Sequence, residues 1–129
     1  MQEEKFIVLV QNVCDDALNI LVGKTQIRFR PMRRKAIVDT KKSYVIGRTN
    51  LRTGLITIDI FTPRKREPKK ISSILKTLCH EVAHHQKPPF RQFYRFRWIT
   101  RQHYPDFYQQ VNYNIEALKK HIKFKEYFK

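Results

Sequence analysis

The chain has 129 residues, a length that suits one folded domain with a core of its own. Hydrophobic residues make up 41% of it, yet no apolar run approaches the ~20 residues of a membrane span, which argues against a membrane protein. Lysine and arginine number 27 against 11 aspartates and glutamates, and this net charge of +16 favours a polyanionic partner.

DNA is the partner that we expect from this charge, bound through phosphates and without sequence specificity. The two cysteines, Cys14 and Cys79, do not form a disulfide framework. Acidic residues precede the short apolar run at 6–10, unlike in a secretory signal. We therefore expect a single domain over residues 1–129 that is intracellular, in the cytoplasm, and has no membrane partner.

An amphipathic helix is predicted over residues 4–22, and Gly23 is a natural end for it. Short segments with strand character follow at 27–29, 36–38, 44–46 and 55–61, separated by turn-forming residues. This order of elements predicts an α+β fold with an N-terminal helix and a small, mostly antiparallel sheet.

The segment from Ile56 to Ile60 alternates between apolar and polar residues, as a half-buried strand does. In zinc endopeptidases a strand beside the metal commonly pairs with an extended substrate. We therefore predict that Ile58, Asp59 and Ile60 contact a polypeptide substrate.

A basic loop connects this strand to the next helix. The predicted phosphate contacts in it are Arg64, Lys65, Arg66, Lys69 and Lys70. A solvated loop without a partner would have the same composition.

The most specific pattern is His80-Glu81-Val82-Ala83-His84, which reads H-E-x-x-H. The surrounding residues have helical periodicity, and histidines at i and i+4 lie on one face of a helix, where both can bind one zinc ion. That face is roughly opposite the apolar stripe, so a core role for the pair is disfavoured. Glu81 is then placed to act as the catalytic base of a metallopeptidase. The stripe consists of Ile71, Ile74, Leu75, Leu78 and Val82.

Pro88-Pro89 ends this helix, and aromatic residues then alternate with arginines from Phe90 to Gln102. The arginines with predicted phosphate contacts are Arg91, Arg95, Arg97 and Arg101. We expect a helix here that packs Phe93, Tyr94 and Trp98 inward and extends its arginines to solvent. The alternative is a platform on which single-stranded nucleic acid stacks.

Pro105 begins a predicted final helix, and a basic tail follows at about 119–129. A catalytic zinc ion normally has three protein ligands. His103, just before this helix, is our main candidate for the third ligand, and Glu116 within the helix is the alternative. Tyr104 is a weaker candidate for stabilising an oxyanion.

The segments around Ile56–Asp59, His80–His84 and His103-Tyr104-Pro105-Asp106-Phe107 together resemble the SprT-like metallopeptidases, which include the Spartan-type proteases of DNA–protein crosslinks. The resemblance covers about residues 36–118. It implies a zincin-like fold with zinc held by His80, His84 and His103. Tyr104 departs from the family pattern, which has glycine there.

The small size and N-terminal helix are also similar to the minigluzincins. That second resemblance implies Glu116 as the third ligand and a C-terminal tail that blocks the cleft.

These observations together predict a zinc-dependent endopeptidase in which Glu81 moves the proton and the basic surface brings DNA-bound or crosslinked proteins to the site. Two alternatives stay open: a latent peptidase blocked by its own tail, and a basic nucleic-acid-binding module without peptidase activity.

Overall fold

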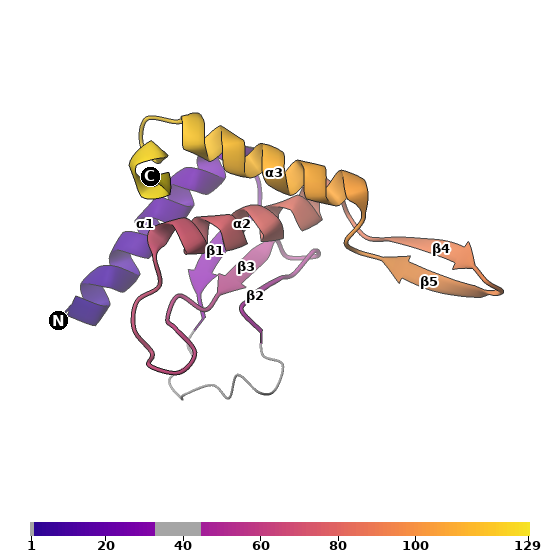
Figure 1. Ribbon diagram of the computed structural model, residues 1–129, viewed down its shortest axis with the longest axis horizontal. Helices are drawn as coiled ribbons and strands as arrows, with labels where there is room; N and C mark the ends of the chain where they lie inside the picture. Colours follow the sequence, from indigo (N-terminus) through magenta and orange to yellow (C-terminus); the bar gives the residue numbers. More distant parts are fainter. Residues whose placement is uncertain (1, 33–44) are drawn as a thin grey trace.

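The computed structural model describes residues 2–32 and 45–129, and the expected α+β fold is confirmed in these ranges. Two of the three α-helices pack against a three-stranded sheet, the third packs on those two helices, and a separate two-stranded hairpin extends from the body (Figure 1). The strand predicted at 36–38 lies outside the described residues. No described helix combines the length and the apolar character that crossing a bilayer requires.

Helix α1 (Gln2–Val22) matches the predicted N-terminal helix. Its inner face packs against the first strand of the sheet and the second helix. Gly23 ends the helix with a positive φ of 63°, a conformation that costs glycine little. The buried residues of α1 are Val10, Val13, Cys14, Ala17 and Leu18.

The sheet has the order β1–β3–β2, with β1 (Arg28–Pro31) parallel to β3 (Leu55–Ile58) and β2 (Gly47–Thr49) antiparallel to it. The strand predicted at 44–46 begins instead at Gly47, and Val45 and Ile46 are exposed. Gly47 lies so close to the second helix that a side chain there would require a neighbouring atom to move.

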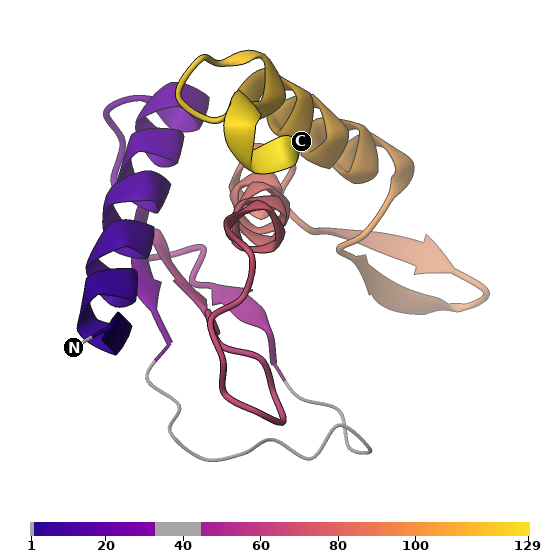
Figure 2. The same ribbon diagram turned by 60° about the vertical axis from the view of Figure 1, so that its left-hand side comes forward.

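Helix α2 (Ile71–Gln86) crosses the inner face of the sheet, and α3 (Pro105–Lys120) packs along α2 on the side away from the sheet (Figures 1 and 2). The predicted stripe of α2 is buried, with Ile74, Leu75, Leu78 and Val82 at most 1% exposed. Both helices were expected from their periodicity. Their packing positions the residues described below.

The segment predicted as a helix after Pro89 is a β-hairpin, so that prediction is wrong. Strands β4 (Phe90–Tyr94) and β5 (Arg97–Arg101) pair in register, with Phe93 opposite Trp98. Aromatic and β-branched residues favour strands, and here aromatic residues point to both faces, so neither face shows an apolar periodicity. The hairpin projects away from the helices and the sheet (Figure 1).

The C-terminal tail forms a short 3₁₀ helix, η1 (Lys125–Phe128), which contacts α2 and α3. Phe124, just before it, is 2% exposed and joins the hydrophobic core, and Tyr127 and Phe128 pack against that core. The tail therefore closes one end of the core.

Candidate metal centre

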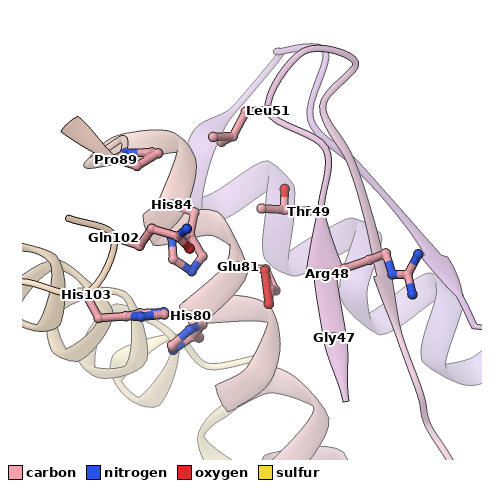
Figure 3. Close-up of a pocket in the computed structure, with 10 residues that line it drawn as sticks. All are labelled: Gly47, Arg48, Thr49, Leu51, His80, Glu81, His84, Pro89, Gln102 and His103. Carbon is pink, nitrogen blue, oxygen red and sulfur yellow. The ribbon is translucent and has the colours of Figure 1, made fainter. Parts of the chain in front are cut away.

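His80 and His84 lie one helical turn apart on α2, and their ring centroids are 5.0 Å apart. His103 reaches them from the short connection between β5 and α3, with ring centroids 5.3 Å from His80 and 5.0 Å from His84. One ring nitrogen from each histidine lies within 4.8 Å of the other two. The three imidazoles converge on one point beside the cleft (Figure 3).

Glu116, the alternative third ligand, is not part of this cluster. Its side chain is 58% exposed, and its carboxylate lies 3.5 Å from the ammonium of Lys119, one turn further along α3. Within the described residues the metal-binding group consists of His80, His84 and His103.

Phe107 forms the base of the histidine cluster. It is fully buried in the first turn of α3, and its ring centroid lies 5.0 Å from that of His80, 4.4 Å from His84 and 5.1 Å from His103. One aromatic side chain thus packs against all three imidazoles. The sequence motif contained this residue, but the one-dimensional pattern did not indicate that it supports the cluster.

Burial keeps the two helical histidines neutral. It lowers the pKa of His84 to about 4, with further lowering from the charges of His80, His103 and His85, and it also lowers the pKa of His80. A neutral imidazole has a free lone pair for a metal, whereas a protonated one has none. His80 and His84 therefore have the protonation state of metal ligands at neutral pH.

Glu81 lies on the α2 face between the cluster and the sheet. It is 7% exposed, and this burial raises the pKa of its carboxyl group to about 7. A Cβ atom at Gly47 would lie 3.4 Å from its Oε1 atom and 3.0 Å from Cγ2 of Thr77. The absence of a side chain at Gly47 thus lets β2 approach the carboxylate closely.

A cleft of about 400 Å³ runs between the histidines and β2 (Figure 3). Its wall on the sheet side is β2, which is anchored to α2 by a hydrogen bond between Thr49 and the ring Nε2 of His85. The side chain of Arg48 points away from the histidines (Figure 3). The lining residues include Gly47, Thr49, Leu51, Pro89 and Gln102, none of which the sequence analysis had selected.

Ile58, Asp59 and Ile60, the predicted substrate contacts, are not among the residues that line the cleft. All three side chains are fully buried, and β3 is the central strand, paired with β1 and β2 on its two sides. A central strand has no free edge for a peptide. The alternation of the segment was real, but it does not reveal the order of strands in the sheet.

Tyr104 is not placed to stabilise an oxyanion. Its hydroxyl donates a hydrogen bond of 2.9 Å to the backbone carbonyl of Pro88, and its ring packs against Phe90. It therefore ties the start of α3 to the end of α2, which fixes the connection that carries His103.

Asn114 is a buried polar residue that the sequence analysis missed. Its amide nitrogen donates to the backbone carbonyl of Cys79 at 3.2 Å and to Oε1 of Gln86 at 2.8 Å, and its oxygen accepts from Gln110 at 3.0 Å. These bonds hold α3 against the part of α2 that carries the two histidines. A lone asparagine in an amphipathic helix offered no signal of this role.

The predicted phosphate-binding residues fall into two separate groups at opposite ends of α2 (Figure 1). The 16 residues of this helix extend for about 24 Å. In the loop, Arg64, Lys65 and Lys70 are exposed and Lys69 is half-buried. On the hairpin, Arg91, Arg95 and Arg97 are exposed, and the partly exposed Arg101 donates to Gln92 at 2.9 Å.

Arg66 differs from the other basic residues of the loop. Its guanidinium forms two hydrogen bonds, of 2.9 and 3.0 Å, with the carboxylate of the fully buried Asp59. Its prediction as a phosphate contact is therefore corrected: it neutralises a buried charge at the end of β3.

The donor set fits a zinc ion. Catalytic zinc sites combine three protein ligands, commonly histidines, with one open position, and here three imidazoles border a cleft. The residues that line the cleft do not include any from the tail at 119–129. Within the described part of the chain, the tail therefore does not block the site.

Neither a protein-family model nor a curated protein matches the chain. Among solved structures, the chain is similar to the crystal structure of the metallopeptidase zymogen of Pyrococcus abyssi abylysin. The two are 21% identical, the alignment covers 92% of this chain and 87% of that one, and the TM-score is 0.46.

Proposed function

We propose that this protein is a zinc-dependent endopeptidase of the zincin type. The observation that supports it best is the convergence of His80, His84 and His103 within 4.8 Å, beside a cleft that also contains Glu81. The proposal further includes a SprT-like relationship, which the motifs at 80–84 and 103–107 support.

Bound zinc supplies Lewis-acid chemistry, polarising the scissile carbonyl and making water a better nucleophile. Glu81 accepts the proton of the attacking water and returns it to the nitrogen of the leaving amine. His80, His84 and His103 would hold the metal through their ring nitrogens, and Phe107, which packs against all three rings, keeps them in place.

The strand that receives the substrate in this proposal is β2, not β3. Gly47 and Thr49 line the cleft, and β2 is an edge strand of its three-stranded sheet. An extended peptide added to that edge would place its backbone across the cleft from the histidines. The packing of Gly47 against Glu81 brings such a peptide close to the catalytic carboxylate.

The test compares the hydrolysis of a denatured protein substrate by the wild type, Glu81→Gln and Glu116→Gln, all loaded with zinc. We expect Glu81→Gln to retain its zinc and lose activity by about 10²- to 10⁴-fold, the usual contribution of a general base. Glu116→Gln is the matched control, because Glu116 is exposed and outside the cluster, and it should keep wild-type activity. Undiminished hydrolysis by Glu81→Gln would rule out the mechanism.

Association with DNA is the second part of the proposal, and the net charge of +16 supports it. Proteins bound or crosslinked to DNA would then be the substrates. Binding through phosphates releases counterions, so the affinity should fall steeply as salt rises. Salt-insensitive binding would contradict this part, and a basic module without peptidase activity would bind DNA but fail the hydrolysis test.

A further inference from the structure

The β4–β5 hairpin exposes large aromatic side chains that no part of the described chain covers. Phe93 is 58% exposed, Tyr94 44%, Trp98 61% and Phe96 96%. A two-stranded hairpin without a covered face is marginally stable in water. Aromatic side chains gathered in this way on the surface mark an interaction site.

Each face of the hairpin combines an aromatic surface with arginine. Phe93 and Trp98 are paired across the strands, with ring centroids 5.5 Å apart, and the guanidinium of Arg91 lies 5.6 Å from the Trp98 ring. On the opposite face, the Tyr94 ring has Arg101 at 5.6 Å, and Arg95, from the turn, lies 5.1 Å from the same ring. Cations thus accompany the rings on both faces.

The charge of the hairpin indicates the chemistry of its partner. The sequence has no aspartate or glutamate from Val82 to Pro105. Within the described residues, none of the four hairpin arginines forms an ion pair with a carboxylate. Arginine and aromatic residues also occur together at protein–protein interfaces, so the absence of carboxylates is what favours an anionic partner here. Arg91 lies near the Trp98 ring, and Arg95 and Arg101 lie near the Tyr94 ring. A partner with planar groups and regular negative charges fits this surface.

The turn of the hairpin is strained in a way that presents one more aromatic side chain. Arg95 and Phe96 have φ angles of 50° and 67°, a left-handed conformation that a two-residue turn requires and that glycine or asparagine usually supplies. Because Phe96 is 96% exposed, intramolecular packing does not offset this strain. Strain at an exposed aromatic residue points to a functional constraint.

We propose that the β4–β5 hairpin is a binding site for single-stranded nucleic acid. Unpaired bases stack on Trp98 and Phe93, and phosphates pair with Arg91, Arg95 and Arg97. The proposal deepens the DNA association proposed above and rests on it, but it does not depend on peptidase chemistry. It also connects the two activities, because β5 leads through Gln102, which lines the cleft, directly to His103.

The chain has a single tryptophan, Trp98, so tryptophan fluorescence reports on this hairpin alone. The experiment titrates a (dT)₁₂ oligonucleotide, and separately a duplex of equal length, into zinc-loaded Glu81→Gln protein. We expect the single strand to quench Trp98 with saturation, and the duplex to do so weakly. Emission that does not change while the single strand binds would overturn the stacking site.

Two variants separate stacking from charge, with binding followed through a labelled (dT)₁₂. Phe93→Ala keeps every arginine, and we expect a loss of affinity of about 5- to 100-fold, the effect of one stacking ring. The control is Tyr113→Ala, which removes an aromatic side chain that is 70% exposed on α3 and should bind as the wild type does. Equal affinity of the two variants would overturn the proposal.

The outcomes also separate this proposal from those on which it rests. Salt-dependent binding that is equal for single strands and duplexes, without quenching, overturns the hairpin site but leaves electrostatic DNA association in place. No binding of either probe at low salt overturns both. Hydrolysis is measured independently on the wild type, so a failure of the peptidase proposal would leave the fluorescence result unaffected.

Discussion

The ring of Phe107 packs against that of His84 with 4.4 Å between the centroids, and the same ring contacts His80 and His103. This contact joins the first turn of α3 to the histidine face of α2. It makes the geometry of the candidate metal centre dependent on the packing of the two helices.

Replacing Phe107 with alanine should weaken metal binding. The three imidazoles would lose their common support and rotate more freely, so we expect zinc affinity to fall by about 10- to 100-fold, as for other residues that orient ligands. Competition for zinc with a chromophoric chelator measures this affinity. Phe124→Ala is the matched control, because Phe124 is equally buried but lies at the other end of α3. Equal zinc affinity in both variants would refute the supporting role.

Arg66 should contribute more to stability than its neighbours in the basic loop. Arg66→Ala removes the guanidinium that pairs with the buried Asp59 carboxylate, and loss of one partner of such a pair costs about 3–5 kcal/mol. Chemical denaturation measures the free energy of unfolding. The exposed Arg64 provides the comparison, and Arg64→Ala should change stability by less than about 0.5 kcal/mol. Similar free energies of unfolding for Arg66→Ala and Arg64→Ala would contradict the ion pair between Arg66 and Asp59.

Removing the tail should destabilise the protein without activating it. Phe124 is 2% exposed in the core, and loss of a buried phenylalanine costs about 3–5 kcal/mol. We therefore expect a chain ending at Lys120 to melt at a lower temperature than the full chain. Its rate of hydrolysis, measured well below both melting temperatures, should not rise. A clear increase in that rate would instead support a latent enzyme blocked by its tail.

The stability of the protein should decline at alkaline pH because of its two buried thiols. Burial raises the pKa of Cys79 to about 12, and burial, followed by the charge of Asp15, raises that of Cys14. An unfolded thiol ionises near pH 8.5, so the stability that depends on neutral thiols is complete below about pH 8.5 and is lost as pH rises further. The slope is at most about 1.4 kcal/mol per pH unit and thiol.

Denaturation with urea at pH 8 and pH 10 measures this decline. Cys79→Ala should show a smaller loss of stability between the two pH values than the wild type. If Cys79→Ala loses as much stability between pH 8 and pH 10 as the wild type does, the buried Cys79 thiol does not contribute to the decline.

The sequence allowed the histidine pair and its helix to be predicted because helical periodicity is a local property. It left His103 and Glu116 as alternatives, because the choice depends on how α3 is rotated against α2. Phe107 and Asn114 fix that rotation through contacts between residues distant in the sequence. Such contacts have no signature along the chain.

The two largest errors have a similar physical origin. The peptide strand was assigned to 58–60 because alternation marks a strand but does not show whether it is central or at an edge. The hairpin was predicted as a packed helix because buried aromatic residues are the more common case. The exposure of Trp98 depends on how the hairpin projects from the body, which local sequence does not specify.

The most direct test of the metal centre is the zinc content per chain of the purified wild type, His103→Ala and Glu116→Ala, determined by elemental analysis. We predict about one zinc per chain in the wild type and in Glu116→Ala, and much less in His103→Ala, because His103 completes the cluster and Glu116 is exposed. Full zinc in His103→Ala, or its loss from Glu116→Ala, would contradict the assigned ligands. No zinc in the wild type, even after reconstitution, would contradict the proposed peptidase.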